Sequence, residues 1–175
     1  MCTFTAKESI LKSMKKPRKT NIPLLLISIA LSQSAGIIGS VFTASSIPTW
    51  YATLEKPFFN PPNWLFGPVW ITLYTLMGIS LYLVWNRQRQ AKKKDYFPVW
   101  LFLLHLVVNA AWSLIFFGAQ NLLAGMITIV ILTILIIQLI KLFYPIQKNA
   151  AFLLVPYLVW VSFATLLNFS LLLLN

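Results

Sequence analysis

The residues best suited to chemistry in this sequence are tryptophan, tyrosine and amide side chains that recur at helical spacing within apolar segments. Steps of three and four residues place such side chains on one face of a helix. Three segments show the pattern, with Trp70 and Tyr74 in one, Asn109 and Trp112 in another, and Trp160, Ala164 and Asn168 in the third. An apolar cavity with a few converging N–H and amide groups suits a flat, mostly apolar ligand. For the tryptophans, spacing alone is equally consistent with a role in lining a ligand site and with plain packing between helices.

The acidic, histidine and cysteine residues argue against most other chemistry. The three acids are Glu8, Glu55 and Asp95, all outside the apolar segments, whereas ion-coupled transporters usually carry a charge within the membrane. No two carboxylates can form an acid–base pair, and no cluster has the spacing of metal ligands. For the single histidine, His105, we favour a neutral hydrogen-bonded imidazole over a haem ligand or a proton carrier. The single cysteine, Cys2, excludes a CxxC site. We therefore predict no metal site and no conventional enzyme active site.

Membrane-spanning helices must position these side chains. The chain is 59% hydrophobic and only 10% charged, whereas globular domains carry about 25% charged residues. A spanning helix needs about 20 residues, and five apolar segments meet that length, at about 23–44, 64–85, 98–117, 122–143 and 149–174. The predicted fold class is an all-α integral membrane protein, a five-transmembrane-helix bundle formed by residues 22–175 after a basic tail at 1–21.

The basic residues predict the orientation of this bundle. Of the 14 lysines and arginines, only Lys56 lies in the first or third connection between the apolar segments. The others precede the first segment, lie in the second connection or, as Lys141 and Lys148, bracket the fourth, as the positive-inside rule expects for cytoplasmic ends. We predict a cytoplasmic N-terminus, an external C-terminus and an external first connection. The net charge of +11 therefore indicates topology and a lipid bilayer, with no nucleic-acid partner.

The first connection, residues 45–63, is the longest between the predicted helices. It contains four prolines and several aromatic residues, a composition unlike that of a disordered linker. Connections of this length are usually functional or disordered. We predict an ordered loop that caps the mouth of the bundle and contributes Trp50, Phe58 and Pro61 to a ligand site.

Four motifs in the sequence resemble the TspO/MBR family, the tryptophan-rich sensory proteins and translocator proteins. The first two are Trp50-Tyr51-x-x-Leu54-x-Lys56-Pro57-x-x-x-Pro61-Pro62 and Gly67-Pro68-Val69-Trp70-x-x-Leu73-Tyr74-x-x-Met77-Gly78. The other two are Asn109-x-x-Trp112-Ser113 and Pro156-Tyr157-x-x-Trp160-x-x-x-Ala164-x-x-Leu167-Asn168. Any one motif would be a weak signal, but the four occur together and in the family's order.

The resemblance implies a ligand pocket among the first, second, third and fifth helices, beneath the first loop, in a protein that is commonly a homodimer. Family members bind tetrapyrroles such as protoporphyrin IX as ligands rather than as cofactors. Some bacterial members are reported to promote light-dependent porphyrin breakdown, with two pocket tryptophans that correspond to Trp70 and Trp160. The family's helix-3 amide corresponds to Asn109, and its helix-5 pocket position to Ala164.

The resemblance leaves three functions open: a sensor or handling protein for tetrapyrroles, which we favour, light-dependent porphyrin degradation, and translocation of porphyrins or other hydrophobic molecules. Sterol recognition is not supported. The cholesterol-associated motif of animal members needs a tyrosine and a following basic residue late in the last helix. This chain has Phe169 there, and neither lysine nor arginine follows it.

Overall fold

The computed structural model describes residues 20–92 and 94–175, and five of its helical segments are long and apolar enough to cross a membrane. The elements are α2 (Ile22–Ser46), α3 (Trp50–Thr53), α4 (Asn63–Gln90), α5 (Phe97–Ser113), the π-helix η1 (Leu114–Gly118), α6 (Leu122–Ile146), α7 (Lys148–Leu153) and α8 (Val155–Leu174). The predicted five-helix membrane bundle is confirmed. Most of the predicted basic tail, residues 1–19, lies outside the described residues.

Local sequence explains where the long helices begin. The Asn21 side chain accepts a hydrogen bond from the backbone N–H of Leu24 at 3.0 Å, and Asn121 accepts one from Ala124 at 2.9 Å. Asparagine at this position satisfies an N–H that the first helical turn leaves free. Pro23 occupies the first turn of α2, where its missing N–H costs nothing.

Three helices differ from their predicted outlines. Helix α4 continues to Gln90 rather than ending near residue 85, because its last turn carries Arg87 and Arg89, which favour the negative end of a helix and can extend to water. The third span ends in the π-helical turn η1. The fifth span is divided at Leu154, two residues before Pro156, because proline lacks an N–H and its ring disfavours the preceding helical turn.

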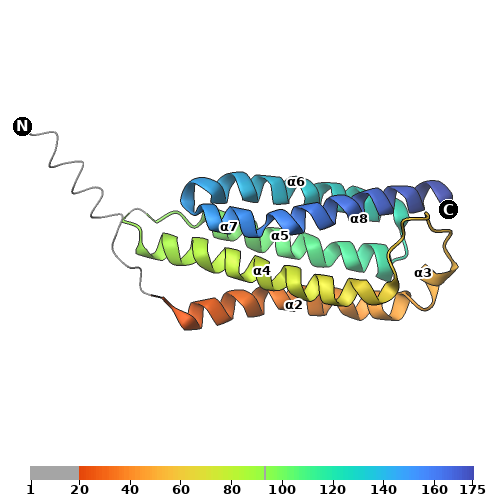
Figure 1. Cartoon of the computed structure of the whole chain (residues 1–175), viewed down its shortest axis with the longest axis horizontal. Helices are drawn as coiled ribbons and strands as arrows, with labels where there is room; N and C mark the ends of the chain where they lie inside the picture. The colour runs from red at the N-terminus through yellow and green to blue at the C-terminus, as the bar shows by residue number, and fades with distance from the viewer. Residues whose placement is uncertain (1–19, 93) are drawn as a thin grey trace, which may run out of the picture.

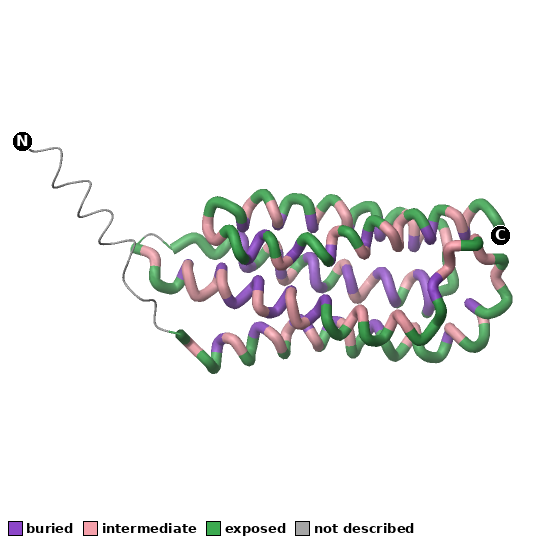
Figure 2. The backbone as a smooth tube through the Cα atoms, in the orientation of Figure 1, coloured by how far each residue is buried: buried purple, intermediate pink, exposed green. Residues whose placement is uncertain are grey.

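The long helices form an elongated bundle, with the α2–α4 connection and the C-terminus at the same end (Figure 1). Helix α2 packs on α4 and α5, and α6 packs on α5 and α8. Buried residues follow the inward faces and exposed residues the outer surface (Figure 2). Large apolar side chains such as Leu26, Ile134 and Leu173 are exposed. An apolar exterior on spans of this length is what a lipid bilayer requires, so this is a multi-pass integral membrane protein.

The α2–α4 contact depends on Gly78. A Cβ added at this glycine would lie 2.6 Å from the Cα of Ile29, a backbone atom that cannot rotate away. We expect Gly78→Ala to separate the two helices and to lower the free energy of unfolding by about 1–3 kcal/mol, the usual cost of overpacking.

Thermal unfolding in detergent measures this loss. The matched control is Gly67→Ala on the same helix, because nothing lies within 4 Å of its added Cβ. Equal midpoints for the two variants would contradict the close packing at Gly78.

Candidate functional site

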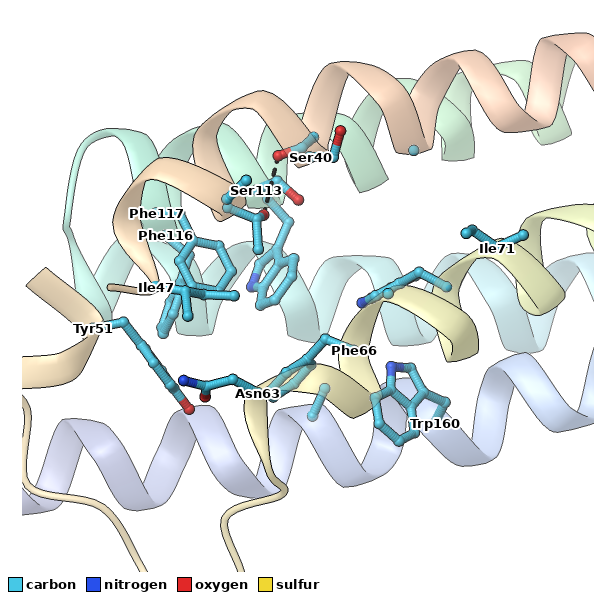
Figure 3. Close-up of a pocket in the computed structure, with 18 of the residues that line it drawn as sticks. Ser40, Ile47, Tyr51, Asn63, Phe66, Ile71, Ser113, Phe116, Phe117 and Trp160 are labelled. Carbon is cyan, nitrogen blue, oxygen red and sulfur yellow. Dashed lines mark hydrogen bonds between the residues drawn. The ribbon is translucent and has the colours of Figure 1, made fainter. Parts of the chain in front are cut away.

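A cavity of about 410 Å³ lies between α2, α4, the end of α5 with η1, and α8, next to the α2–α4 connection (Figure 3). Helix α4 packs closely on α7 but makes few contacts with α8. The break at Leu154 therefore lets the last span diverge from α4. The wall of the cavity is mainly aromatic and apolar, as is usual for sites that bind small organic molecules.

Six of the ten predicted site residues line this cavity. They come from three different spans and are Trp70, Tyr74, Trp112, Trp160, Ala164 and Asn168. The ring of Trp70 stacks on Tyr74 with centroids 5.4 Å apart, and Trp160 meets Phe66 edge-on at 6.2 Å. The helical spacing seen in the sequence thus brings these side chains to one cavity.

The other four predicted residues lie elsewhere. Trp50 packs edge-on against Phe116, a wall residue, with centroids 5.6 Å apart. Pro61 is buried in the α2–α4 connection, and Phe58 is fully exposed at 101%. Asn109 is buried behind the wall, where its side chain accepts from the Tyr74 hydroxyl and donates to the Tyr157 hydroxyl at 2.8 Å.

Several wall residues were not predicted from the sequence. Helix α2 contributes Gln33, Gly36 and Ser40, and the end of the third span contributes Phe116 and Phe117. Small residues recur every four positions along α2, at Ser32, Gly36 and Ser40, which is also the pattern of close helix packing. Gly36 has both roles. It lines the cavity, and it allows close packing, because an added Cβ there would lie 2.6 Å from the Cδ2 atom of Tyr74.

Two polar side chains of the cavity wall lack hydrogen-bond partners within residues 20–92 and 94–175. They are Trp112, through its indole Nε1, and Asn168, through both atoms of its amide, although both side chains are buried. Buried polar groups are nearly always paired, and leaving one unpaired costs about 1–3 kcal/mol. Both groups are covered in the unliganded protein, so a ligand with hydrogen-bonding groups at its edge would satisfy them once these side chains turn towards the cavity.

The cavity also reaches the outer surface between α2 and α4. Ile37 and Ile71 line it, and their side chains are 64% and 62% exposed. Gln33 joins the two helices here, because its Nε2 donates to the Ile71 carbonyl at 3.1 Å and to the Thr75 hydroxyl at 3.0 Å. Both helices are spans, so this opening faces the lipid.

Hydrogen bonds within the α2–α4 connection and to Asn175 hold this connection in place. The Lys56 ammonium donates to the carbonyls of Ala52 and Leu54 at 3.2 and 2.9 Å and lies 5.1 Å from the centre of the Tyr51 ring. The Asn175 side chain accepts from the Glu55 N–H at 2.9 Å and donates to its carbonyl at 3.1 Å. Lys56 therefore stabilises the connection, and the cavity wall carries no charged side chain among the residues described.

Tyr51 makes the stability of this connection depend on pH. Its hydroxyl donates to Asn60 Oδ1 at 2.7 Å, and burial raises the pKa of its phenol from 10.0 to about 12. The unfolded chain therefore ionises first, so this stabilisation is complete below pH 10 and is lost between about pH 10 and 12.

We expect the thermal midpoint to fall more steeply in this alkaline range for the wild type than for Tyr51→Phe. The difference between the two curves isolates Tyr51 from the other groups that titrate there. Parallel curves would contradict the contribution of Tyr51.

The described residues contain no group of three histidine, cysteine or acidic side chains that could hold a metal ion. The arrangement is an aromatic cavity with polar N–H and amide groups at one edge. Such an arrangement can stack a planar molecule and hydrogen-bond its rim.

Comparison with known proteins agrees with the motifs. The profile of the TspO/MBR family matches residues 28–174. The chain is 48% identical over 157 residues to a protein named tryptophan-rich protein TspO from Archaeoglobus fulgidus, covering 89% of this chain and 99% of that protein. It is 37% identical over 144 residues to the human translocator protein, covering 82% of this chain and 85% of that protein. It is 33% identical over 150 residues to protein CrtK of Rhodobacter capsulatus, covering 86% of this chain and 91% of that protein. Since the profile spans nearly the whole bundle and these relatives align over most of their length, the chain belongs to the TspO/MBR family.

Proposed function

We propose that this membrane protein binds a tetrapyrrole in the cavity beneath the α2–α4 connection and acts as a sensor or handling protein for it. The observation that carries this proposal is the pair of unpartnered polar side chains, Trp112 and Asn168, in an otherwise aromatic wall. A macrocycle offers a flat apolar face for the rings and polar groups at its rim for these two side chains. The cavity volume of about 410 Å³ is within the usual range of roughly 300–1,000 Å³ for ligand sites.

The residues present fit such a ligand through stacking and neutral hydrogen bonds rather than ion pairs. Trp70 and Trp160 supply indole rings for stacking, from α4 and α8. Lys56 is the only basic residue of the α2–α4 connection, and its ammonium already donates to two carbonyls there. We therefore expect the anionic side chains of a porphyrin to extend towards water at the end of the bundle that holds this connection.

Titration of the purified protein with protoporphyrin IX in the dark tests the proposal, with tryptophan fluorescence as the readout. We expect saturable quenching in the micromolar range or tighter, weakened in a Trp70→Phe, Trp160→Phe double variant that remains folded. Weak quenching that does not saturate and is the same in both proteins would overturn the proposal.

Light-dependent porphyrin degradation is a second candidate function. Trp70 lines the cavity and contacts two buried phenols, stacking on Tyr74 at 5.4 Å and meeting Tyr157 edge-on at 6.3 Å. Electron donors next to a bound pigment favour photochemistry on it. Product formation that requires light and both Trp70 and Trp160 would support this function, whereas a bound porphyrin that is unaltered after illumination would exclude it.

Translocation is a third candidate, and the opening between α2 and α4 favours it. This opening lets a hydrophobic molecule reach the cavity from the lipid, and relatives of the chain carry the name translocator protein. Porphyrin flux into proteoliposomes that exceeds the flux into protein-free vesicles would support transport.

We also propose that the protein forms a homodimer, with its N-terminus cytoplasmic and its C-terminus external. Crosslinking tests the homodimer, and protease protection in vesicles tests the orientation.

A further inference from the structure

A chain of hydrogen bonds crosses three spans directly behind the cavity wall. It joins the hydroxyl of Tyr74 on α4 to the amide of Asn109 on α5, then to the hydroxyl of Tyr157 on α8, and from there to His105 Nε2 at 3.0 Å. The side chains of His105 and Tyr157 are completely buried. The proposed ligand site uses the outer end of this chain, at Tyr74, and leaves the His105–Tyr157 pair without a role.

The partners determine which atom donates in each bond. His105 Nδ1 faces the Phe102 carbonyl at 3.3 Å, and since a carbonyl can only accept, Nδ1 carries the hydrogen. The imidazole is neutral, because a buried cation within the bilayer is costly and neither of the acidic residues that the structure describes, Glu55 and Asp95, lies in a span. Nε2 is therefore an acceptor. The amide of Asn109 donates to the Tyr157 oxygen at 2.8 Å, which leaves the Tyr157 proton directed at His105 Nε2.

The phenol of Tyr157 is thus hydrogen-bonded to a base, His105, and lies next to Trp70, an indole of the cavity wall. The ring of Tyr157 does not line the cavity, but its centroid lies 6.3 Å from that of Trp70. A phenol gives up an electron far more readily when its proton can move to a base at the same time. Imidazole is such a base at neutral pH. Tyr74 is less suited, because its hydroxyl donates to an amide oxygen, which is only weakly basic.

We propose that Tyr157 and His105 form a redox pair that returns an electron to Trp70 after Trp70 has been oxidised. The proposal rests on the light-dependent function suggested above, with a photoexcited tetrapyrrole as the oxidant. Trp70 loses one electron to that oxidant and becomes an indole radical cation. Tyr157 then gives one electron to Trp70 and its phenolic proton to His105 Nε2, which leaves a neutral tyrosyl radical and an imidazolium. Trp70 is thereby restored and can donate again.

Electron paramagnetic resonance of the protoporphyrin-loaded protein, frozen after illumination, tests the proposal. Ring-deuterated tyrosine in the protein narrows a tyrosyl signal and so identifies it. We expect a tyrosyl radical in the wild type, its loss in Tyr157→Phe, and a yield reduced roughly tenfold or more in His105→Gln, because an amide cannot take the proton. Tyr144→Phe is the matched control and should keep the radical, because this ring is exposed on α6 and lies outside the cavity.

A second measurement needs no porphyrin, so a failure of ligand binding and a failure of the redox pair can be told apart. Photoionisation of the tryptophans by an ultraviolet pulse produces indole radicals directly, and transient absorption follows their conversion to a tyrosyl radical. The fraction of tyrosyl radical that is lost in Trp70→Phe is the fraction that forms by electron transfer to Trp70. That fraction should also disappear in Tyr157→Phe and form more slowly in His105→Gln, provided that each variant retains its thermal midpoint. Equal conversion in all these proteins would overturn the proposal.

Discussion

Replacing Trp112 by phenylalanine and Asn168 by leucine is expected to weaken protoporphyrin IX binding by about 10- to 100-fold, since each lost hydrogen bond costs about 1 kcal/mol. Leucine keeps the branched shape of asparagine, and phenylalanine keeps an aromatic ring at position 112 that is smaller than the indole. The two groups have no protein partner among the described residues. Removing them should therefore leave the thermal midpoint unchanged or raised, because an unpaired buried polar group is costly in the unliganded protein.

A loss of ligand affinity without a loss of thermal stability distinguishes contact with the ligand from plain packing. Side chains that serve only packing would lose stability and affinity together. Trp100→Phe is the matched control, because this indole is 68% exposed on the outer surface and lies outside the cavity. Wild-type affinity in the double variant would show that neither group contacts the ligand.

Replacing Asn109 by leucine is expected to lower the free energy of unfolding by about 1–3 kcal/mol, because two interhelical hydrogen bonds are lost and the buried Tyr74 hydroxyl is left unpaired. Its amide is the only link between Tyr74 and Tyr157 in the hydrogen-bond chain. Because Trp70 stacks on Tyr74, freeing the Tyr74 ring should also loosen the cavity wall. Ligand affinity should therefore fall with stability.

A double-mutant cycle separates this network from simple packing. Asn109→Leu and Tyr74→Phe remove the two partners of one hydrogen bond, so their effects on unfolding should not add, and the double variant should lose less than the sum of the single losses. Strictly additive losses, measured by thermal unfolding in one detergent, would mean that the two residues act independently.

The sequence predicted the membrane bundle well because its signals are strong. Five apolar segments of spanning length and the alternation of charged connections leave few other folds. The details that it missed are local. The continuation of α4 through Arg87 and Arg89 is hidden because charged residues look like a connection, although long basic side chains can extend from a helix end to water. The π-helical end of the third span has no simple pattern.

The site was predicted in part, for a physical reason. Trp70, Trp112 and Trp160 belong to one cavity because each shares a helix face with polar residues, and such faces avoid lipid. Helix α2 was harder to place, because a stripe of small residues predicts close packing on a neighbour and says nothing about a cavity beside it. Phe58 was predicted to contribute to the site, but its side chain is fully exposed at 101%. An aromatic ring in a proline-rich connection need not point inward.

If the tetrapyrrole is held inside the cavity, a side chain that fills the cavity should abolish its binding. Ala164 is a small, half-buried residue of the cavity wall, so Ala164→Phe places a ring in the space that the ligand would occupy. The neighbouring Leu166→Phe, on the exposed face of α8, is the control. The measurement is a dark titration with protoporphyrin IX. We expect saturable binding to be lost in Ala164→Phe and kept in Leu166→Phe, with both proteins folded. Unchanged affinity in Ala164→Phe would place the ligand outside this cavity and contradict the proposed function.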